Sequence, residues 1–273
     1  MKHYIKQRLR ESLLNEELSD EDKIINLLKT GNESNIELAY AVGKGQKINV
    51  GELVKSIYGI LLNKAKGKTI KDKLIRLTNL GELWLNDYDL TSLPEGIENL
   101  TNLWGLYLQI NKLTSLKGTE NLTNLKELYL NNNELTSLPE GIENLTNLKW
   151  LGLRNNELTS LEGIENLTNL EGLHLGWNKL TTLKGIEKLT NLKELYLRNN
   201  ELTSLEGIKN LTSLEGIKNL TNLEGLHLGW NKLTTLKGID KLTNLKWLGL
   251  QDNPISGSEK ARLKKIFGNK VIF

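Results

Sequence analysis

The sequence has 273 residues, with 36 Lys and Arg against 33 Asp and Glu, so the formal net charge is +3. This balance gives no general attraction to nucleic acid or to an anionic membrane. The absence of cysteine excludes disulfides, Cys-ligated zinc and thiol catalysis.

No segment has the apolar length of a targeting signal or a membrane span. The opening MKHYIKQRLRESLL is interrupted by charges, and no stretch approaches the roughly 20 apolar residues that cross a bilayer. We therefore expect a cytoplasmic protein, and export by a route with an uncleaved signal stays open.

Residues 1–70 have the apolar spacing of helices. SDEDKIINLL (19–28) opens one expected helix, with Ser19 and Asp22 as a capping box. A second helix is expected over 36–42, and a third helix is expected to follow Asn49, which would be its N-cap. The apolar residues of this third helix share one face: Val50, Leu53, Val54, Ile57 and Leu61.

A period of about 22 residues begins at residue 77. The tetrapeptide LTNL occurs eight times, ending at Leu80, Leu103, Leu125, Leu148, Leu170, Leu192, Leu223 and Leu245. Each copy continues as L-x-x-L-x-L-x-x-N-x-L, except that Tyr88 replaces the asparagine in the first. Periods of about 20–29 residues indicate a solenoid.

The leucine spacing predicts one strand in each repeat. The leucines of L-x-L point to one face of a strand and the residue between them to the other. Neighbouring repeats are expected to stack into a parallel sheet over a continuous leucine core, while an asparagine ladder bonds the buried turn backbone. The ladder consists of Asn111, Asn133, Asn156, Asn178, Asn200, Asn231 and Asn253.

This pattern resembles the leucine-rich repeats, especially bacterial internalin-type and phosphatase-regulator repeats; Pro94 and Pro139 lie in the two 23-residue units. The resemblance implies an α/β repeat solenoid, a horseshoe with a parallel β-sheet on its concave face and helical caps at both ends. We expect an N-terminal cap over 1–70, eight repeats over 71–256 and a C-terminal cap over 257–273. Leu263, Ile266 and Phe267 would cover the last repeat.

The strand residues other than leucine are expected on the concave face. They include five of the six tryptophans and both histidines beyond His3, although only 5% of the chain is aromatic. Trp, Tyr and Arg are typical of binding hot spots, whereas rings that only pack across strands would stiffen the sheet. We predict partner binding by Trp84, Tyr107, Tyr129, Trp150, Arg154, His174, Trp177, Tyr196, Arg198, His227, Trp230 and Trp247.

The glycines and histidines of this face allow more specific predictions about side-chain packing and metal binding. Trp150 is expected to lie beside Gly152, and Trp247 beside Gly249, on the same strands. His174 and His227 occupy equivalent positions two repeats apart, or roughly 10 Å, which is long for shared metal ligation. We expect neither a metal nor a cofactor.

A non-catalytic, monomeric module that binds a protein partner is the predicted function. No nucleophile–base arrangement is evident, and without cysteine the leucine-rich repeat ubiquitin ligases are excluded. Carbohydrate or a small ligand on the same face is the alternative. Nucleic acid is disfavoured, because Glu82, Asp87, Glu127, Glu194 and Asp252 share the face and would repel phosphates.

The chain also contains copied segments. LTSLEGIKN occurs twice within 202–220, which lengthens one interval from 22 to 31 residues. Its apolar residues at every third position predict 3₁₀-like turns, one copy bulging from the return segment, between strands that stay in register. NLTNLEGLHLGWNKLTTLKGI is likewise identical at 166–186 and 219–239, so whole units have been copied.

Overall fold

The structure, a computed structural model, describes residues 18–203 and 220–273. The chain divides into two compact units, residues 1–83 with 94–103 and residues 84–93 with 104–273. The domain boundaries expected after residues 70 and 256 stay predictions.

The helices of the first unit begin at side-chain caps. They are α2 (Asp20–Lys29), α3 (Glu33–Gln46), α4 (Val50–Tyr58) and α5 (Ile70–Thr78), with the 3₁₀ segments η1 (Gly59–Lys64) and η2 (Ile97–Asn99). Ser19 and Asp22 form the expected capping box, and the Asn49 side chain accepts from the backbone N–H of Glu52. The three helices expected from the sequence are therefore confirmed, the one at 36–42 as part of α3.

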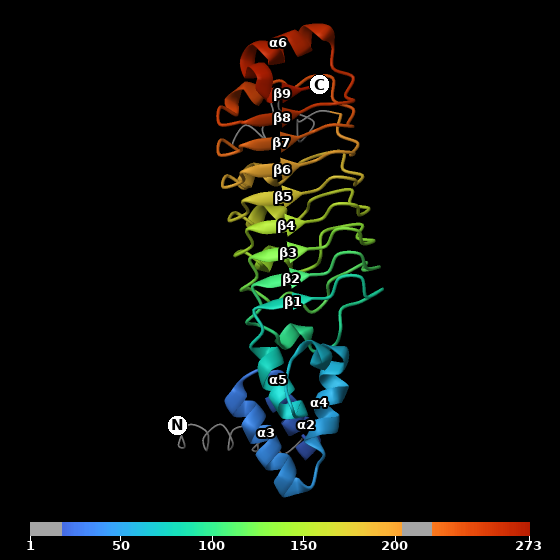
Figure 1. Cartoon of the computed structure of the whole chain (residues 1–273), viewed down its shortest axis with the longest axis vertical. Helices are drawn as coiled ribbons and strands as arrows, with labels where there is room; N and C mark the ends of the chain where they lie inside the picture. The colour runs from blue at the N-terminus through green and yellow to red at the C-terminus, as the bar shows by residue number, and fades with distance from the viewer. Residues whose placement is uncertain (1–17, 204–219) are drawn as a thin grey trace. The chain divides into compact units, whose positions relative to one another are not determined.

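Nine short strands form one sheet whose order follows the sequence (Figure 1). They are β1 (Glu82–Trp84), β2 (Gly105–Tyr107), β3 (Glu127–Tyr129), β4 (Trp150–Gly152), β5 (Gly172–His174), β6 (Glu194–Tyr196), β7 (Gly225–His227), β8 (Trp247–Gly249) and β9 (Val271–Ile272). The pairs from β2 to β9 are parallel, and the eight predicted strand positions are confirmed. The sequence did not predict β9.

The predicted asparagine ladder is confirmed inside the second unit. Asn178, for example, donates to the carbonyl oxygens of Leu153 (2.9 Å) and Leu175 (3.0 Å) and accepts from the N–H of Leu158 (3.0 Å). The other members repeat these bonds across successive repeats. The ladder thus satisfies backbone groups that the leucine core removes from water.

The return segments turn at left-handed glycines. Gly141, Gly163, Gly185 and Gly238 have φ of 79°, 92°, 96° and 85° and directly precede short 3₁₀ turns. These turns are η3 (Ile142–Asn144), η4 (Ile164–Asn166), η5 (Ile186–Lys188) and η6 (Ile239–Lys241). Glycine recurs in the repeat because residues with a Cβ rarely adopt this conformation.

The sheet continues across the long repeat. Strands β6 and β7 pair in register, with Leu195 opposite Leu226. Asn222 still donates to the carbonyl of Thr190 (2.9 Å), and Asn231 to that of Leu197 (2.9 Å). The prediction of adjacent, in-register strands is confirmed, whereas the bulge and the 3₁₀-like turns predicted for the doubled nonapeptide lie outside the described residues.

A short helix and a final strand end the second unit. In α6 (Gly257–Phe267), Leu263 and Phe267 are buried, but Ile266 is 42% exposed, so its expected packing is wrong. The segment η7 (Gly268–Lys270) leads to β9, which pairs with β8. The last repeat is therefore covered by a strand as well as a helix.

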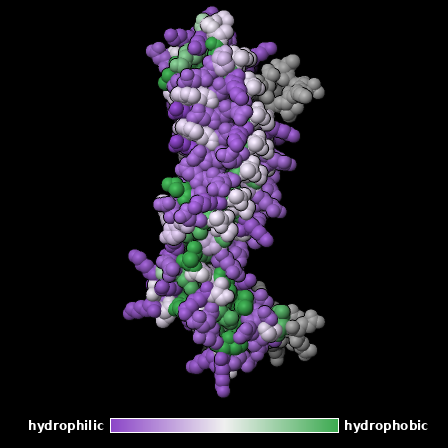
Figure 2. Space-filling model, turned by 90° about the vertical axis from the view of Figure 1, so that its right-hand side faces the viewer, coloured by the Kyte–Doolittle hydropathy of each residue, from purple (hydrophilic) through white to green (hydrophobic). Residues whose placement is uncertain are grey.

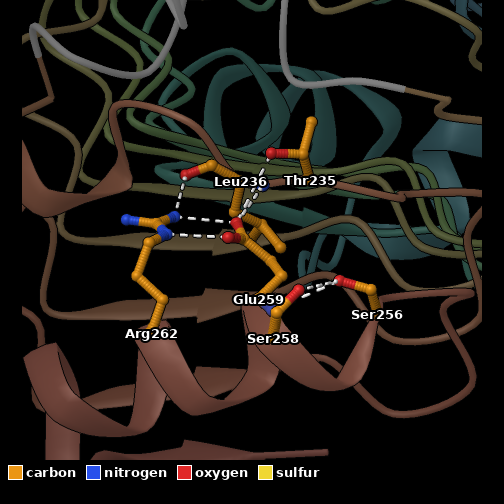
Figure 3. A network of polar contacts seen from close by, with 6 residues as sticks. All are labelled: Thr235, Leu236, Ser256, Ser258, Glu259 and Arg262. Atoms are coloured by element: carbon orange, nitrogen blue, oxygen red, sulfur yellow. Dashed lines mark hydrogen bonds and ion pairs between the residues drawn. The ribbon is translucent and has the colours of Figure 1, made fainter.

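A polar clamp holds α6 against the preceding turn. Figure 3 shows Glu259 and Arg262 reaching from the helix to Leu236. Arg262 donates twice to the Glu259 carboxylate, at 2.7 Å each, and Glu259 accepts from the N–H of Leu236 at 2.9 Å. The Arg262 guanidinium lowers the pKa of Glu259 to about 2.

Candidate functional site

One column of side chains runs through the middle of the strands, and we call its rings the aromatic ladder. Its members are Trp84, Tyr107, Tyr129, His174, Tyr196 and His227, with Gly152 and Gly249 in the same column. The strand leucines point the other way and are buried. We call the surface that carries the ladder the strand face; it is the face that the sequence predicted to be concave.

The ladder begins with parallel stacking. The rings of Trp84 and Tyr107 lie 3.8 Å apart at 7°, and those of Tyr107 and Tyr129 lie 5.5 Å apart at 9°. Tyr107 also donates to the Glu127 carboxylate at 2.8 Å. Trp84 stays 52% exposed while Tyr107 is buried, so the stack presents one open ring.

The later ladder rings meet at larger angles, 64° for His174 and Tyr196 and 38° for Tyr196 and His227. His174 lies 4.4 Å from Tyr196, and Tyr196 lies 6.4 Å from His227. His227 contacts Trp247 at 4.9 Å. Burial lowers the pKa of His174, and burial together with the Arg198 charge lowers the pKa of His227. Both imidazoles are therefore held toward their neutral forms.

Glycines make room for two indoles, though not both as predicted. A Cβ on Gly172 would lie 2.2 Å from the Trp150 ring, so Trp150 covers the glycine of the next strand. Gly152, its expected neighbour, instead lies under Tyr129, where a Cβ would be 2.8 Å from the ring. The Trp247 and Gly249 pairing is confirmed, with a corresponding distance of 2.8 Å.

A second group, which we call the Arg–Trp stack, lies where the strands end. It consists of Arg154, Trp177, Arg198 and Trp230, from four successive repeats. The Arg154 guanidinium carbon lies 4.1 Å from the Trp177 ring centre. The corresponding distances from Arg198 are 4.9 Å to Trp177 and 3.8 Å to Trp230. Cations and indoles thus alternate along the sheet.

Both indoles of this stack occupy left-handed backbone positions. The third position after each of the strands β1 to β8 is such a residue, with φ between 53° and 59°, and most of these residues are Asn or Asp. Trp177 and Trp230 have φ of 55° and 53°. Their backbone N–H groups donate to the backbone carbonyls of Arg198 and Gln251, at 2.7 Å each. The column is Asp87, Ile110, Asn132, Asn155, Trp177, Asn199, Trp230 and Asp252.

The structure places all twelve predicted site residues on the strand face, but in separate groups. Three belong to the parallel stack, four to the series of inclined rings and four to the Arg–Trp stack, while Trp150 lies over Gly172. Ring-to-ring packing therefore accounts for part of the aromatic clustering. Trp230 is 38% exposed, and Trp84 is more so.

Sequence reasoning missed exposed apolar residues in the first repeats. Tyr88, Trp104 and Ile110 are 49%, 39% and 55% exposed. Trp104 stands where later repeats carry Lys or Glu, and Ile110 stands in the left-handed column, so each departure from the repeat was a usable signal. On the side shown in Figure 2, hydrophobic side chains of the solenoid form small separate patches among hydrophilic ones.

The described part of the chain offers neither a membrane span nor a metal cluster. Over residues 18–203 and 220–273, no helix combines the length and apolarity needed to cross a bilayer. In the same ranges, no group of three or more His, Asp or Glu residues is arranged to hold a metal ion.

Comparisons with known proteins agree with the repeat architecture. Residues 107–232 match the family model of a leucine-rich repeat region. Among solved structures, the chain is similar to a leucine-rich repeat protein of Leptospira interrogans, at 38% identity over 74% of this chain, with a TM-score of 0.67. It covers 50% of that protein's length.

A second similar structure is internalin C2 of Listeria monocytogenes. The identity is 28% over 81% of this chain and 91% of that one, with a TM-score of 0.62. No curated protein matches the sequence.

Proposed function

Because this chain is a leucine-rich repeat protein, we propose that its solenoid is a recognition module that docks a protein partner on the strand face. Leucine-rich repeat proteins are generally non-enzymatic scaffolds for protein–protein recognition. The observation that carries the proposal is the combination of open indoles, at Trp84 and Trp230, with the Arg–Trp stack on one hydrogen-bonded sheet.

Rigidity and residue type favour docking over packing alone. Rings held by neighbouring strands lose little conformational freedom on binding, which lowers the entropic cost of association. Trp and Arg are also the residue types that most often dominate binding energy. Packing explains the buried Tyr107 but leaves the outer surface of Trp84 in water.

Carbohydrate binding on the same face is the second candidate. Indole rings can stack on sugars, and nearby amides can bond to hydroxyl groups. The side-chain oxygens of Gln109 and Gln251 are buried and have no hydrogen-bond partner within the described residues. A ligand hydroxyl could supply one if the side chains rotated outward.

Capture of partners by the immobilised full chain tests the proposal. We expect a protein bound by the wild type to be lost from Trp84→Ala and Trp230→Ala. Trp104→Ala is the matched control, because Trp104 is 39% exposed but lies outside the ladder and the Arg–Trp stack. A partner that all three variants retain would contradict docking on the strand face. Saturable binding on a glycan array, without protein capture, would favour the carbohydrate alternative.

A further inference from the structure

The Arg–Trp stack leaves the edges of two guanidinium groups available. The guanidinium carbon of Arg198 lies over the rings of both Trp177 and Trp230, and that of Arg154 over the ring of Trp177. Stacking uses the faces of a guanidinium but leaves its in-plane N–H donors for hydrogen bonds. The Nε of Arg198 is buried and has no hydrogen-bond partner among the described residues.

The charges of these arginines also lack acidic partners, unlike many lysines of the solenoid. Lys149 and Lys193 both pair with Glu171, at 3.0 and 2.6 Å, and Lys246 pairs with Glu224 at 2.8 Å. Within residues 18–203 and 220–273, neither Arg154 nor Arg198 forms an ion pair. The two arginines are two repeat spacings apart, with the repeat of Trp177 between them, which corresponds to roughly 10 Å of separation.

The indoles that hold the arginines are not residues that the turn requires. Asn and Asp adopt left-handed φ more readily than Trp does, and five of the eight turn positions carry them. Trp230 lies in the copied segment and so repeats Trp177. The backbone alone would favour asparagine at both positions, which points to a role for the indoles in fixing the guanidinium groups.

We propose that the Arg–Trp stack binds two carboxylate side chains of an acidic segment in the protein partner. This inference rests on the proposed docking function and names the chemistry of the partner. A guanidinium held against indole rings presents a fork of N–H donors that matches a carboxylate. An extended segment places residues two or three positions apart at about 7–10 Å, which suits the separation of the two arginines.

Acidic side chains fit this surface better than a phosphate backbone does. The strand face also carries carboxylates along its length, namely Glu82, Asp87, Glu127, Glu194 and Asp252. A continuous row of phosphates would be repelled by them. A protein segment can place its carboxylates only opposite the arginines, and neutral residues elsewhere.

Binding of a labelled ten-residue Gly/Ser peptide that carries two Glu three positions apart (the diglutamate peptide), measured by fluorescence anisotropy with the full chain, tests this inference. We expect saturable binding that weakens at least about tenfold in Arg154→Gln/Arg198→Gln. Lys184→Gln/Lys188→Gln also removes two positive charges, but from a return segment and not from the strand face. This variant is expected to leave binding within about twofold of the wild type. Arg154→Lys/Arg198→Lys keeps the charge but not the fork, and we expect most of the loss to remain.

Several results would overturn the inference. These are equal binding of the diglutamate peptide and of the same peptide with both Glu replaced by Gln, equal losses in the arginine and lysine variants, or tighter binding of a ten-residue oligothymidylate than of the diglutamate peptide. If the proposed docking function itself is wrong, the result is different: no captured partner is lost from the Trp84→Ala variant. If only the acidic-segment inference is wrong, partners lost from the Trp84 variant are retained by Arg154→Gln/Arg198→Gln.

Discussion

Replacing Trp177 with asparagine tests whether this indole serves the fold or the partner. Relief of the left-handed φ of 55° is worth about 1 kcal/mol. Asn155 already donates to Asn132 across one repeat at 2.8 Å, and the introduced amide could extend that row, for about 0.5–1 kcal/mol. Against this stand two cation–π contacts of about 0.5–1 kcal/mol each and about 1 kcal/mol of apolar burial.

These opposing contributions nearly cancel, so Trp177→Asn should change the free energy of unfolding by no more than about 1 kcal/mol. Urea unfolding followed by far-UV circular dichroism measures this, and the same variant should lose binding of the diglutamate peptide. Trp177→Ala is the control: it loses the stack and gains neither the left-handed preference nor the amide bond of asparagine, so it should be about 1.5–2 kcal/mol less stable than Trp177→Asn. A loss above about 2 kcal/mol in the asparagine variant would refute the reasoning, because the indole would then be a structural element.

Three further predictions concern the scaffold. Gly172→Ala should cost about 1–3 kcal/mol, because its Cβ meets the Trp150 ring, whereas Gly225→Ala, in the identical copied segment but with no atom within 4 Å, should cost nothing in the same urea assay. Asn178→Ala should cost about 3 kcal/mol, since three buried backbone groups lose their partner; a loss below about 1 kcal/mol would contradict the role of the ladder. The pKa of Glu259 in the folded state, about 2, is below its ordinary value of 4.5. The ionised carboxylate therefore adds to the free energy of unfolding, by about 2 kcal/mol after solvent screening. This stabilisation is fully present above pH 4.5 and is lost as the pH falls toward 2. The stability difference between wild type and Glu259→Gln should shrink over that range, and a constant difference would argue against the clamp.

The sequence alone predicted those parts of the fold in which every repeat has the same residue making the same contact. Leucine spacing located eight strands, and the recurring asparagine located the ladder, because each is a backbone requirement that every repeat shares. The strand β9 escaped prediction because VIF, at the end of the chain, carries none of the repeat pattern. Its position depends on pairing with β8, which is a tertiary contact.

The details of the candidate site depend on contacts between repeats. Trp150 was expected over Gly152 because the two share a strand, yet its ring lies across the sheet on Gly172. The alternation of Arg198 with Trp177 and Trp230 links residues 21 and 32 positions apart along the chain. Left-handed turns favour Asn, so a tryptophan in that column gives no local indication of its conformation.

The hydrogen bonds that cross the long repeat have a consequence for how this surface can change. Asn222 and Asn231 bridge to the preceding repeat although the interval between the two repeats is 31 residues instead of 22. A duplicated unit can therefore be inserted without re-registering its neighbours, and each insertion extends the sheet by one strand spacing of about 4.8 Å. Recombination within the gene could thus change the number of contact residues on the strand face by one repeat at a time. The affinity for a partner could then change with the number of repeats, before any single contact is optimised.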